Sequence, residues 1–242
     1  MAVTAIIPAR FSSTRLEGKP LVDIAGKPMI QRVWQAAVEA KTINNVIIAT
    51  DDQRIKDEVE SFGGDAVLTP EKLSSGTDRI AHVVYQIYPS DRPAWVVNVQ
   101  GDEPLITGEI IDQLVVFAIR SDSRITTIVT KCDKIGEEDC NVVKVVMDKN
   151  NYALYFSRSS IPYCKDSTRE FFKHIGIYAF KTDALLDFSQ MKPGELEKTE
   201  KLEQLRALEN GWKIKCVNIP QAKNLIGVDT PEDLEKVRDY LK

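Results

Sequence analysis

The sequence predicts an α/β protein with a mostly parallel sheet that is covered by helices on both faces. Short runs rich in valine and isoleucine alternate with stretches in which apolar residues recur every three or four positions. Continuous apolar runs are typical of strands buried on both faces, as in parallel sheets. At 242 residues the chain fits a single domain spanning 1–242.

The first half of the chain carries the clearest alternation of strands and helices. The predicted strands are 3–7, 45–49, 66–68 and 95–99, and the amphipathic stretches between and after them are 30–38, 55–62, 80–87 and 110–118. This order of elements is typical of a Rossmann-like fold, in which helices connect parallel strands.

The pattern changes near residue 125. Four strand-like runs follow with little helical pattern between them, at 125–129, 142–146, 152–156 and 175–180. We therefore expect a mixed, partly antiparallel section from about 134 to 181, inserted within the domain. Beyond it, a helix is expected from 199 to 210 and a strand from 213 to 217. A last helix is expected after Thr230, with Leu234, Val237 and Leu241 on its apolar side.

Composition excludes several classes of protein. The chain has 32 lysines and arginines against 36 aspartates and glutamates, a net charge of −4, which disfavours a nucleic-acid binder. No apolar run approaches the roughly 18 residues of a membrane span, and no signal peptide is recognised. Four cysteines without C-x-x-C spacing indicate reduced thiols, so we expect a cytoplasmic protein with no membrane partner.

The loop after the first strand is rich in cations. Arg10, Arg15 and Lys19 lie among serine, threonine and glycine residues. The loop is not a Walker A loop, because Pro20 follows Lys19, and no G-x-G-x-x-G is present. Ligands of open α/β sheets bind at the carboxyl ends of strands, and three cations match the charge of a triphosphate. The alternative is a solvated basic loop.

Two aspartates follow other predicted strands. Asp102, in Gln100-Gly101-Asp102, comes directly after a buried strand, and Mg²⁺ takes carboxylate oxygens together with substrate phosphates. Gly101 allows a close backbone approach. Near the C-terminus, Thr230 is the expected cap of the last helix, which leaves Asp229 unexplained and suits it to a second metal ligand. Taken alone, either aspartate could instead be a turn carboxylate.

A further helix start is expected at Ser75-Gly-Thr-Asp-Arg79, with the serine or the threonine as its cap. Arg79 is our candidate for a nucleotide contact. On the residues alone, a surface arginine is the competing interpretation.

Eight sequence blocks resemble one family. They occur in order along nearly the whole chain and comprise Pro8-Ala-Arg-x-x-Ser-Thr-Arg-Leu-x-Gly-Lys-Pro-Leu21, Ala49-Thr-Asp51, Ser75-Gly-Thr-Asp-Arg79, Val97-Asn-Val-Gln-Gly-Asp-Glu-Pro104, Tyr152-Ala-Leu-Tyr-Phe-Ser-Arg158, His174-x-Gly-Ile-Tyr178, Leu202-Glu-Gln-Leu-Arg206 and Gly227-Val-Asp-Thr-Pro-Glu-Asp-Leu234. Together they resemble the 3-deoxy-manno-octulosonate (Kdo) cytidylyltransferases, also called CMP-Kdo synthetases. Each block alone is weak, but the ordered set is specific.

The resemblance implies transfer of CMP from CTP to the anomeric 2-hydroxyl of Kdo, an acidic eight-carbon sugar, for lipopolysaccharide synthesis. It implies triphosphate binding by Arg10, Ser13, Arg15 and Lys19, and it places Arg79, Gln100 and the first-loop backbone at Ala9 near the cytidine or between it and the sugar. It implies Mg²⁺ on Asp102 and Asp229, a homodimer formed near 134–181, and a sugar site of Gln100, Arg158, His174, Tyr178, Glu203 and Gln204. Without the resemblance, His174 and Tyr178 could be core residues, and Glu203 and Gln204 a solvated helix face.

Two positions depart from the family pattern. Relatives usually have proline where this chain has Glu17, and an acid beside a triphosphate is unfavourable, so we expect Glu17 to point into solvent. Relatives often have histidine or glutamine at the position of Ser74, whose short side chain reaches less far.

Three alternatives stay open. The sugar could be an amino-modified Kdo or another sugar acid such as a sialic acid, or the acceptor a sugar 1-phosphate. A non-catalytic nucleotide-binding regulator is the competing class, although binding alone does not require two metal carboxylates. No side chain is an obvious general base, so we expect metal activation of the attacking hydroxyl.

Overall fold

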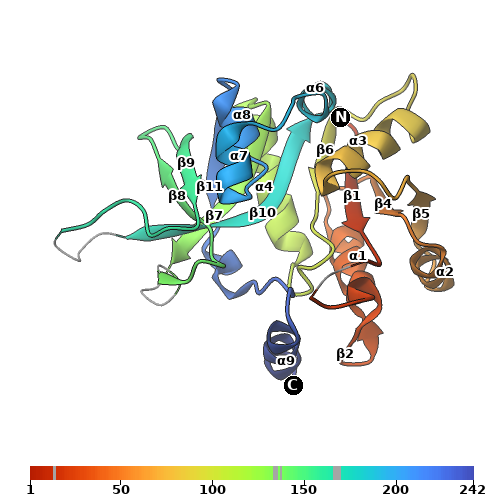
Figure 1. Ribbon diagram of the computed structural model, residues 1–242. Coiled ribbons are helices and arrows are strands. Elements are labelled where there is room, and N and C mark those ends of the chain that lie inside the picture. The colour runs from red at the N-terminus through yellow and green to blue at the C-terminus, as the bar shows by residue number, and fades with distance from the viewer. Residues whose placement is uncertain (13–14, 133–135, 137, 166–169) are drawn as a thin grey trace. The chain divides into compact units, whose positions relative to one another are not determined.

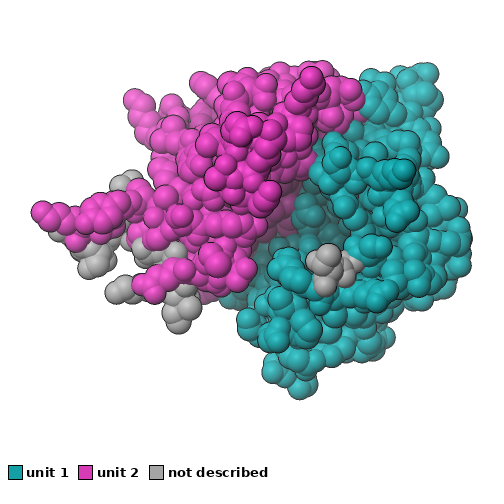
Figure 2. Space-filling view, viewed as in Figure 1, with its two compact units in different colours: residues 1–112, 224–242 teal, residues 113–223 magenta. Residues whose placement is uncertain are grey.

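The computed structural model describes residues 1–12, 15–132, 136, 138–165 and 170–242. The chain divides into two compact units, shown in different colours in Figure 2. The first consists of Met1–Asp112 and Asn224–Lys242, and the second of Gln113–Lys223. The division by itself does not decide whether the units fold together, so the single domain over 1–242 stays a prediction.

The first unit contains four parallel strands in the order β6–β1–β4–β5. They are β1 (Val3–Ala9), β4 (Asn45–Thr50), β5 (Asp65–Leu68) and β6 (Trp95–Asn98). Six of the seven residues of β1 are buried, since helices cover the sheet and neighbouring strands flank it. The predicted parallel sheet is confirmed, with each strand within two residues of its expected place.

Three helices, α1 (Met29–Glu39), α2 (Gln53–Ser61) and α3 (Gly76–Ile87), pack against these strands (Figure 1). Each buries most of the apolar stripe that the sequence predicts, although Val38 at the end of α1 and Ile87 at the end of α3 are exposed. Between β1 and α1 lie a short 3₁₀ helix, η1 (Lys19–Leu21), and a small hairpin of β2 (Asp23–Ile24) and β3 (Lys27–Pro28).

The C-terminal helix, α9 (Pro231–Tyr240), belongs to the first unit although it is distant in sequence from its neighbours. Leu234 and Val237 pack with Ile24 and Met29 in one buried cluster. This packing brings the residues just before α9 back to the unit that holds the first loop. Helix α4 (Gly108–Ser121) carries the chain from the first unit into the second.

The second unit is built on a mixed sheet. Its strands are β7 (Ile125–Cys132), β8 (Lys144–Met147), β9 (Ala153–Ser157), β10 (Phe171–Lys181) and β11 (Ile214–Asn218). β7 pairs antiparallel with β10 and parallel with β11, while β8 and β9 form an antiparallel ribbon. The predicted mixed section is confirmed, and its mixed pairing extends beyond 134–181 to residues 125 and 218.

The helix expected over 199–210 is wrong as a single element. The chain instead forms α7 (Glu195–Glu200) and α8 (Leu205–Glu209), which follow α6 (Thr182–Ser189). Lys201 ends α7 in the left-handed conformation, with φ of 56°. This turn lets Leu202 and Leu205 both be buried, and it places Glu203 and Gln204 in the connection rather than on a helix face.

A second 3₁₀ helix, η2 (Pro220–Asn224), follows β11. Within the described ranges, every helix is too short or too polar to cross a bilayer.

Candidate active site

Phe11 and Gly18 of the first loop lie against each other. The Phe11 carbonyl accepts a hydrogen bond from Gly18 N at 3.0 Å, which closes the loop at the start of η1. Gly18 has φ of 65°, a conformation that favours glycine, and a Cβ there would lie 3.3 Å from the Phe11 ring. The guanidinium of Arg54 lies over the same ring, 3.3 Å from its centroid. These contacts fix the positions of Phe11 and Gly18 within a polar loop.

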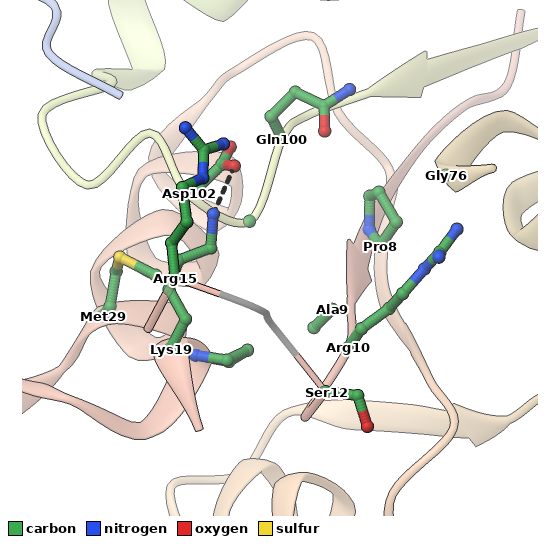
Figure 3. A pocket seen from close by; sticks show the side chains of 12 residues that line it. Pro8, Ala9, Arg10, Ser12, Arg15, Lys19, Met29, Gly76, Gln100 and Asp102 are labelled. Atoms are coloured by element: carbon green, nitrogen blue, oxygen red, sulfur yellow. Dashed lines mark hydrogen bonds and ion pairs between the residues drawn. The ribbon is translucent and has the colours of Figure 1, made fainter. Parts of the chain in front are cut away.

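A cavity of about 400 Å³ lies in the first unit beside this loop. Of the predicted site residues, the lining includes Ala9, Arg10, Arg15, Lys19, Gln100 and Asp102, and it also includes Pro8, Ser12, Pro20, Met29, Gly76 and Gly101 (Figure 3). The structure therefore brings the ends of β1 and β6 to one cavity, as expected for neighbouring parallel strands.

Two carboxylates converge on one ammonium group at this site. Lys19 Nζ lies 2.8 Å from Asp102 Oδ2 and 3.0 Å from Asp229 Oδ1. Arg15 Nη2 lies 2.9 Å from Asp229 Oδ2. In Figure 3 Lys19 and Asp102 are joined in this way, and Arg10 stands apart from them. The predicted pairing of two distant aspartates at one place is thus present in the fold.

Lys19 is held as a cation. Burial disfavours its charge, but the carboxylates of Asp102 and then Asp229 outweigh burial and raise the pKa of Lys19 above its ordinary value. The ammonium therefore marks a point of strongly negative potential between the two carboxylates.

The same two carboxylates fit a divalent cation that is shared with substrate. Their oxygens already surround one cation, the Lys19 ammonium, from two separate chain segments. Across the described ranges, no group of three or more histidine, cysteine, aspartate or glutamate side chains is arranged to hold a metal. A metal here would need further ligands, and Mg²⁺ normally takes them from water and phosphate oxygens.

Asp229 is fixed by the start of α9. Thr230 caps the helix by accepting a bond from Asp233 N at 3.2 Å, and Pro231 occupies the first turn, as predicted. Asp233 Oδ2 accepts bonds from the backbone N–H groups of Thr230 at 3.1 Å and Asp229 at 3.3 Å. Val228 N also donates to Asp102 O at 2.8 Å, which ties the two aspartate-bearing segments together. Asp233 was not among the predicted site residues.

The cavity wall depends on close backbone approach at Gly101. A Cβ at this position would lie 2.7 Å from the Pro8 carbonyl oxygen, which no side chain could accept without a backbone shift. The expected need for glycine is confirmed, and its cause is contact between the segment after β6 and the end of strand β1. Ser12 and Gly76 also line the cavity, although sequence reasoning did not select them.

Arg79 is fully buried beneath this region. Its Nη2 donates to Asp51 Oδ2 at 2.8 Å, and its Nη1 bonds Thr69 Oγ1. Burial lowers the pKa of Arg79, with the Asp51 carboxylate acting in the opposite direction. Arg79 is therefore not the exposed surface arginine of the competing interpretation, and its contact with nucleotide stays a prediction. Ser75 caps α3, as expected.

Two smaller expectations concern the loops. Glu17 is exposed, which confirms that it points into solvent. Ser74 is exposed as well. Ser13 lies outside the described residues, so its predicted phosphate contact stays a prediction.

A second group of predicted residues lies together in the second unit. The rings of His174 and Tyr178, both on β10, are 5.4 Å apart, and Phe156 packs edge-on against His174 at 5.0 Å. Burial, followed by the charge of Glu203, raises the pKa of Tyr178 well above its ordinary value. Three of the expected sugar residues, His174, Tyr178 and Glu203, are therefore neighbours, whereas Gln204 is buried at the start of α8.

His174 is held in its neutral form. Burial lowers its pKa from the ordinary value of 6.5 to about 3. Its Nε2 lies 3.0 Å from Thr127 Oγ1, and that hydroxyl donates to the carbonyl of Ile177 at 2.9 Å. Since Thr127 has one hydroxyl hydrogen, His174 Nε2 is the donor to Oγ1, which leaves Nδ1 as an acceptor.

Arg158 follows β9 and is held mainly by Glu200. Its backbone N donates to Glu200 Oε2 at 3.0 Å, and its Nε donates to Glu200 O at 3.1 Å. Nη1 donates to Cys140 O at 3.2 Å. The guanidinium is thus oriented by carbonyl oxygens.

A family model and a set of curated proteins agree on the family of this chain. A family model described as cytidylyltransferase matches residues 4–214. Among curated proteins, 3-deoxy-manno-octulosonate cytidylyltransferases from Fusobacterium nucleatum and Francisella tularensis subsp. novicida are 47% and 50% identical to this chain. The alignment covers 100% of this chain and 98% of the first relative, and 96% of this chain and of the second.

One solved structure supports the same family, and a second shares the fold. CMP:2-keto-3-deoxy-manno-octonic acid synthetase, solved in complex with CTP, is 37% identical with a TM-score of 0.93 and covers 100% of this chain and 98% of its own. A 4-diphosphocytidyl-2C-methyl-D-erythritol synthase from Anaerococcus prevotii is 16% identical with a TM-score of 0.65, covering 99% and 98%, and supports the fold alone.

These findings first define a class, the α/β nucleotidyltransferase enzymes. Within it, the chain belongs to the cytidylyltransferase family, in the group of the 3-deoxy-manno-octulosonate cytidylyltransferases. The family resemblance of the eight sequence blocks is confirmed.

Proposed function

We propose that this protein transfers CMP from CTP to the anomeric 2-hydroxyl of Kdo and releases pyrophosphate. The observation that carries the proposal is the convergence of Lys19, Asp102 and Asp229 beside a cavity of about 400 Å³ in a member of the cytidylyltransferase family. A cation-rich loop and paired carboxylates at one strand edge are the parts that nucleotidyl transfer requires.

The nucleotide side of the reaction is assigned to the first unit. Arg10, Arg15 and Lys19 bind the β- and γ-phosphates and stabilise the charge that develops on departing pyrophosphate. The Ser13 hydroxyl adds a hydrogen bond to the same phosphates, and the backbone at Ala9 contacts the cytidine. Arg79 and Gln100 contact the cytidine, and Gln100 also reaches toward the sugar.

Asp102 and Asp229 are the carboxylates that would hold Mg²⁺. When bound, the ion supplies Lewis-acid stabilisation of phosphate charge and lowers the pKa of a nearby hydroxyl. Because Lys19 now bridges both carboxylates, its ammonium must move to the triphosphate when substrate binds. The positive charges of Arg10, Arg15 and Lys19 then oppose the negative charge of the bound triphosphate.

The acceptor side is assigned to Arg158, His174, Tyr178, Glu203 and Gln204. Arg158 binds the carboxylate of the sugar acid, since its guanidinium is held only by carbonyl oxygens among its described partners. Neutral His174 offers Nδ1 as an acceptor for a sugar hydroxyl. Tyr178, Glu203 and Gln204 bind the remaining hydroxyls.

The chemical step is an in-line displacement at the α-phosphorus. The 2-hydroxyl oxygen forms a bond to phosphorus, the bond from phosphorus to the bridging oxygen breaks, and pyrophosphate leaves with that oxygen. The hydroxyl proton passes to solvent water. Among the described residues that line the nucleotide cavity, Asp102 is the only acid and is assigned to the metal, and His174 and Glu203 are assigned to other hydroxyls of the sugar.

The biological setting follows from this reaction. We place the enzyme in the cytoplasm, where CTP is available, in lipopolysaccharide synthesis, and as a homodimer formed near residues 134–181. Neither nucleic acid nor a membrane is a partner.

A substrate panel tests the proposal. Pyrophosphate release should be fastest with CTP and Kdo, and slower by at least tenfold when UTP, a sialic acid or a sugar 1-phosphate replaces one of them. Faster pyrophosphate release with the amino-modified Kdo than with Kdo would identify the amino-modified sugar as the acceptor. Binding of CTP without pyrophosphate release from any pair would instead identify a nucleotide-binding regulator.

A further inference from the structure

Arg158 is anchored more thoroughly than a surface arginine, and most of its anchors lead to Glu200. The carboxylate of Glu200 accepts from the backbone N of Arg158, and its carbonyl accepts from the Arg158 side chain. One residue at the end of α7 therefore fixes both the backbone and the guanidinium at the end of β9.

The Glu200 carboxylate does not neutralise the guanidinium. Oε1 accepts from Ser157 Oγ at 2.6 Å, while Oε2 accepts from Arg158 N at 3.0 Å. Within the described ranges, no carboxylate lies within ion-pair distance of the Arg158 side chain. An arginine that is held by carbonyls and lacks an acidic partner is suited to a ligand's carboxylate.

A second buried cation supports the same segment. Lys144 on β8 is fully buried, and its Nζ donates to the carbonyls of Asp139 at 2.8 Å, Val142 at 2.7 Å and Arg158 at 2.6 Å. These three bonds use all three ammonium hydrogens. Lys144 thus ties the 139–142 segment to Arg158, and Cys140 in that segment accepts from Arg158 Nη1.

Two positive groups beside one another favour an anionic ligand. Lys144 Nζ lies 2.6 Å from the Arg158 carbonyl oxygen. Burial lowers the pKa of Lys144, and Asp139 acts in the opposite direction. The carboxylate of Glu200 is directed at the backbone and at a hydroxyl, so it forms no ion pair with the guanidinium.

We infer that Glu200 is a positioning residue that orients Arg158 toward the carboxylate of the acceptor sugar acid, with Lys144 holding the backbone of the same arginine. The inference rests on the proposed function for the identity of the ligand, and on the geometry alone for the orientation of Arg158. Glu200 does not contact the acceptor in this proposal and acts through Arg158.

The orientation is measured without substrate. Nitrogen-15 NMR of the full chain should show a protected Arg158 Nε–H and a backbone amide shifted by its bond to a carboxylate. Glu200→Ala removes the carboxylate that accepts from Arg158 N and Ser157 Oγ, so that amide should shift. The backbone carbonyl that accepts from Nε stays in the variant, and we expect the Nε–H to exchange about tenfold faster because the Arg158 backbone is no longer held against α7. Glu195→Ala is the matched control, because Glu195 lies exposed on the same helix and pairs only with Lys198 among its described side-chain partners. Unchanged Arg158 signals in Glu200→Ala would overturn the inference.

Kinetics then connect the orientation to the acceptor. With Kdo and CTP, Glu200→Ala should raise KM for Kdo by about ten- to a hundredfold and change KM for CTP less than twofold. Arg158→Ala should give a similar loss, and the double variant should be no worse than Arg158→Ala alone. Additive losses, or equal changes in both KM values, would contradict action through Arg158.

The two hypotheses fail differently. If the wild type and Glu195→Ala release no pyrophosphate with Kdo while the NMR effect of Glu200→Ala is present, the proposed function fails and the positioning of Arg158 stands. If both proteins turn over Kdo and Glu200→Ala does so with an unchanged KM, the positioning role fails and the function stands. Circular dichroism and thermal unfolding of each variant check that the fold is retained.

Discussion

At the scale of single residues, the site is organised by where carboxylates are directed. Asp102 and Asp229 share one cation, whereas Asp233 and Glu200 spend their oxygens on backbone N–H groups and hydroxyls. The first pair was predictable, because Asp102 follows a buried strand and both aspartates were left without a local role. The expected strand end before Asp229 is wrong, since irregular chain after η2 leads into Asp229. The second pair was not, since their partners are defined only when a cap or a distant strand is in place.

Removing the carboxylate of either Asp102 or Asp229 should slow the metal-dependent reaction strongly. We expect Asp102→Asn or Asp229→Asn to lower kcat by about 10²–10³-fold with saturating Mg²⁺, because one of two fixed charges on the ion is lost. Binding of Mn²⁺ in the presence of CTP, measured by electron paramagnetic resonance, should weaken in parallel. Asp91→Asn, at an exposed position, is the control. Near-full turnover in either site variant would contradict the assignment.

The depressed pKa of His174 predicts a dependence of stability on pH. The folded protein binds this proton near pH 3, and the unfolded chain binds it near the ordinary value of 6.5. Between those values the unfolded state holds more protons, so stability is complete above about pH 6.5 and declines as pH falls toward 3. The slope from this group approaches about 1.4 kcal/mol per pH unit.

His174→Gln should remove that contribution. Urea unfolding at pH 5, 6, 7 and 8 should show a stability difference between wild type and variant that changes by about 1 kcal/mol per unit below pH 6 and stays constant above pH 7. A pH-independent difference over the whole range would show that the histidine is solvated in the folded state.

At the scale of elements, the strands of the first unit were predictable because they are continuous apolar runs. The helix over 199–210 was not, because its apolar spacing is compatible with one helix and the break at Lys201 depends on burying Leu202 and Leu205 together. Pairing in the mixed sheet was likewise beyond the sequence, since β7 has one parallel and one antiparallel neighbour. Whether a segment forms a strand can be predicted from its local sequence. Which strand it pairs with depends on residues that are far apart in the chain.

The start of α9 links an element's stability to the site. Thr230→Ala removes the cap that Asp233 N donates to, so we expect a loss of about 1 kcal/mol in the free energy of unfolding. Because Asp233 also holds Asp229 N, the variant should weaken Mn²⁺ binding more than stability alone explains. Thr199→Ala, on an exposed helical position without a capping role, serves for comparison. Equal Mn²⁺ affinity in Thr230→Ala and Thr199→Ala would show that the cap of α9 does not affect the metal site.

At the scale of the whole molecule, the first unit is made from both ends of the chain and the second from its middle. Asp229 reaches the first loop only because α9 packs with Ile24 and Met29. The candidate metal carboxylates are therefore 127 positions apart, from 102 to 229, with the second unit between them in sequence. The site on the first unit forms only after the intervening chain has been synthesised and the C-terminal segment has docked.

Helix α4 predicts that the two units unfold together. It spans the boundary between Asp112 and Gln113, and it buries Ile111 on one side of that boundary and Leu114 on the other. A helix gains stability cooperatively along its length, so its two halves should not melt independently. We expect one transition across 1–242 in urea, with fluorescence of single-tryptophan proteins that keep Trp95 or Trp212 giving the same midpoint. Separate midpoints for the two reporters would show two domains, and CTP would then raise the midpoint of the Trp95 protein alone.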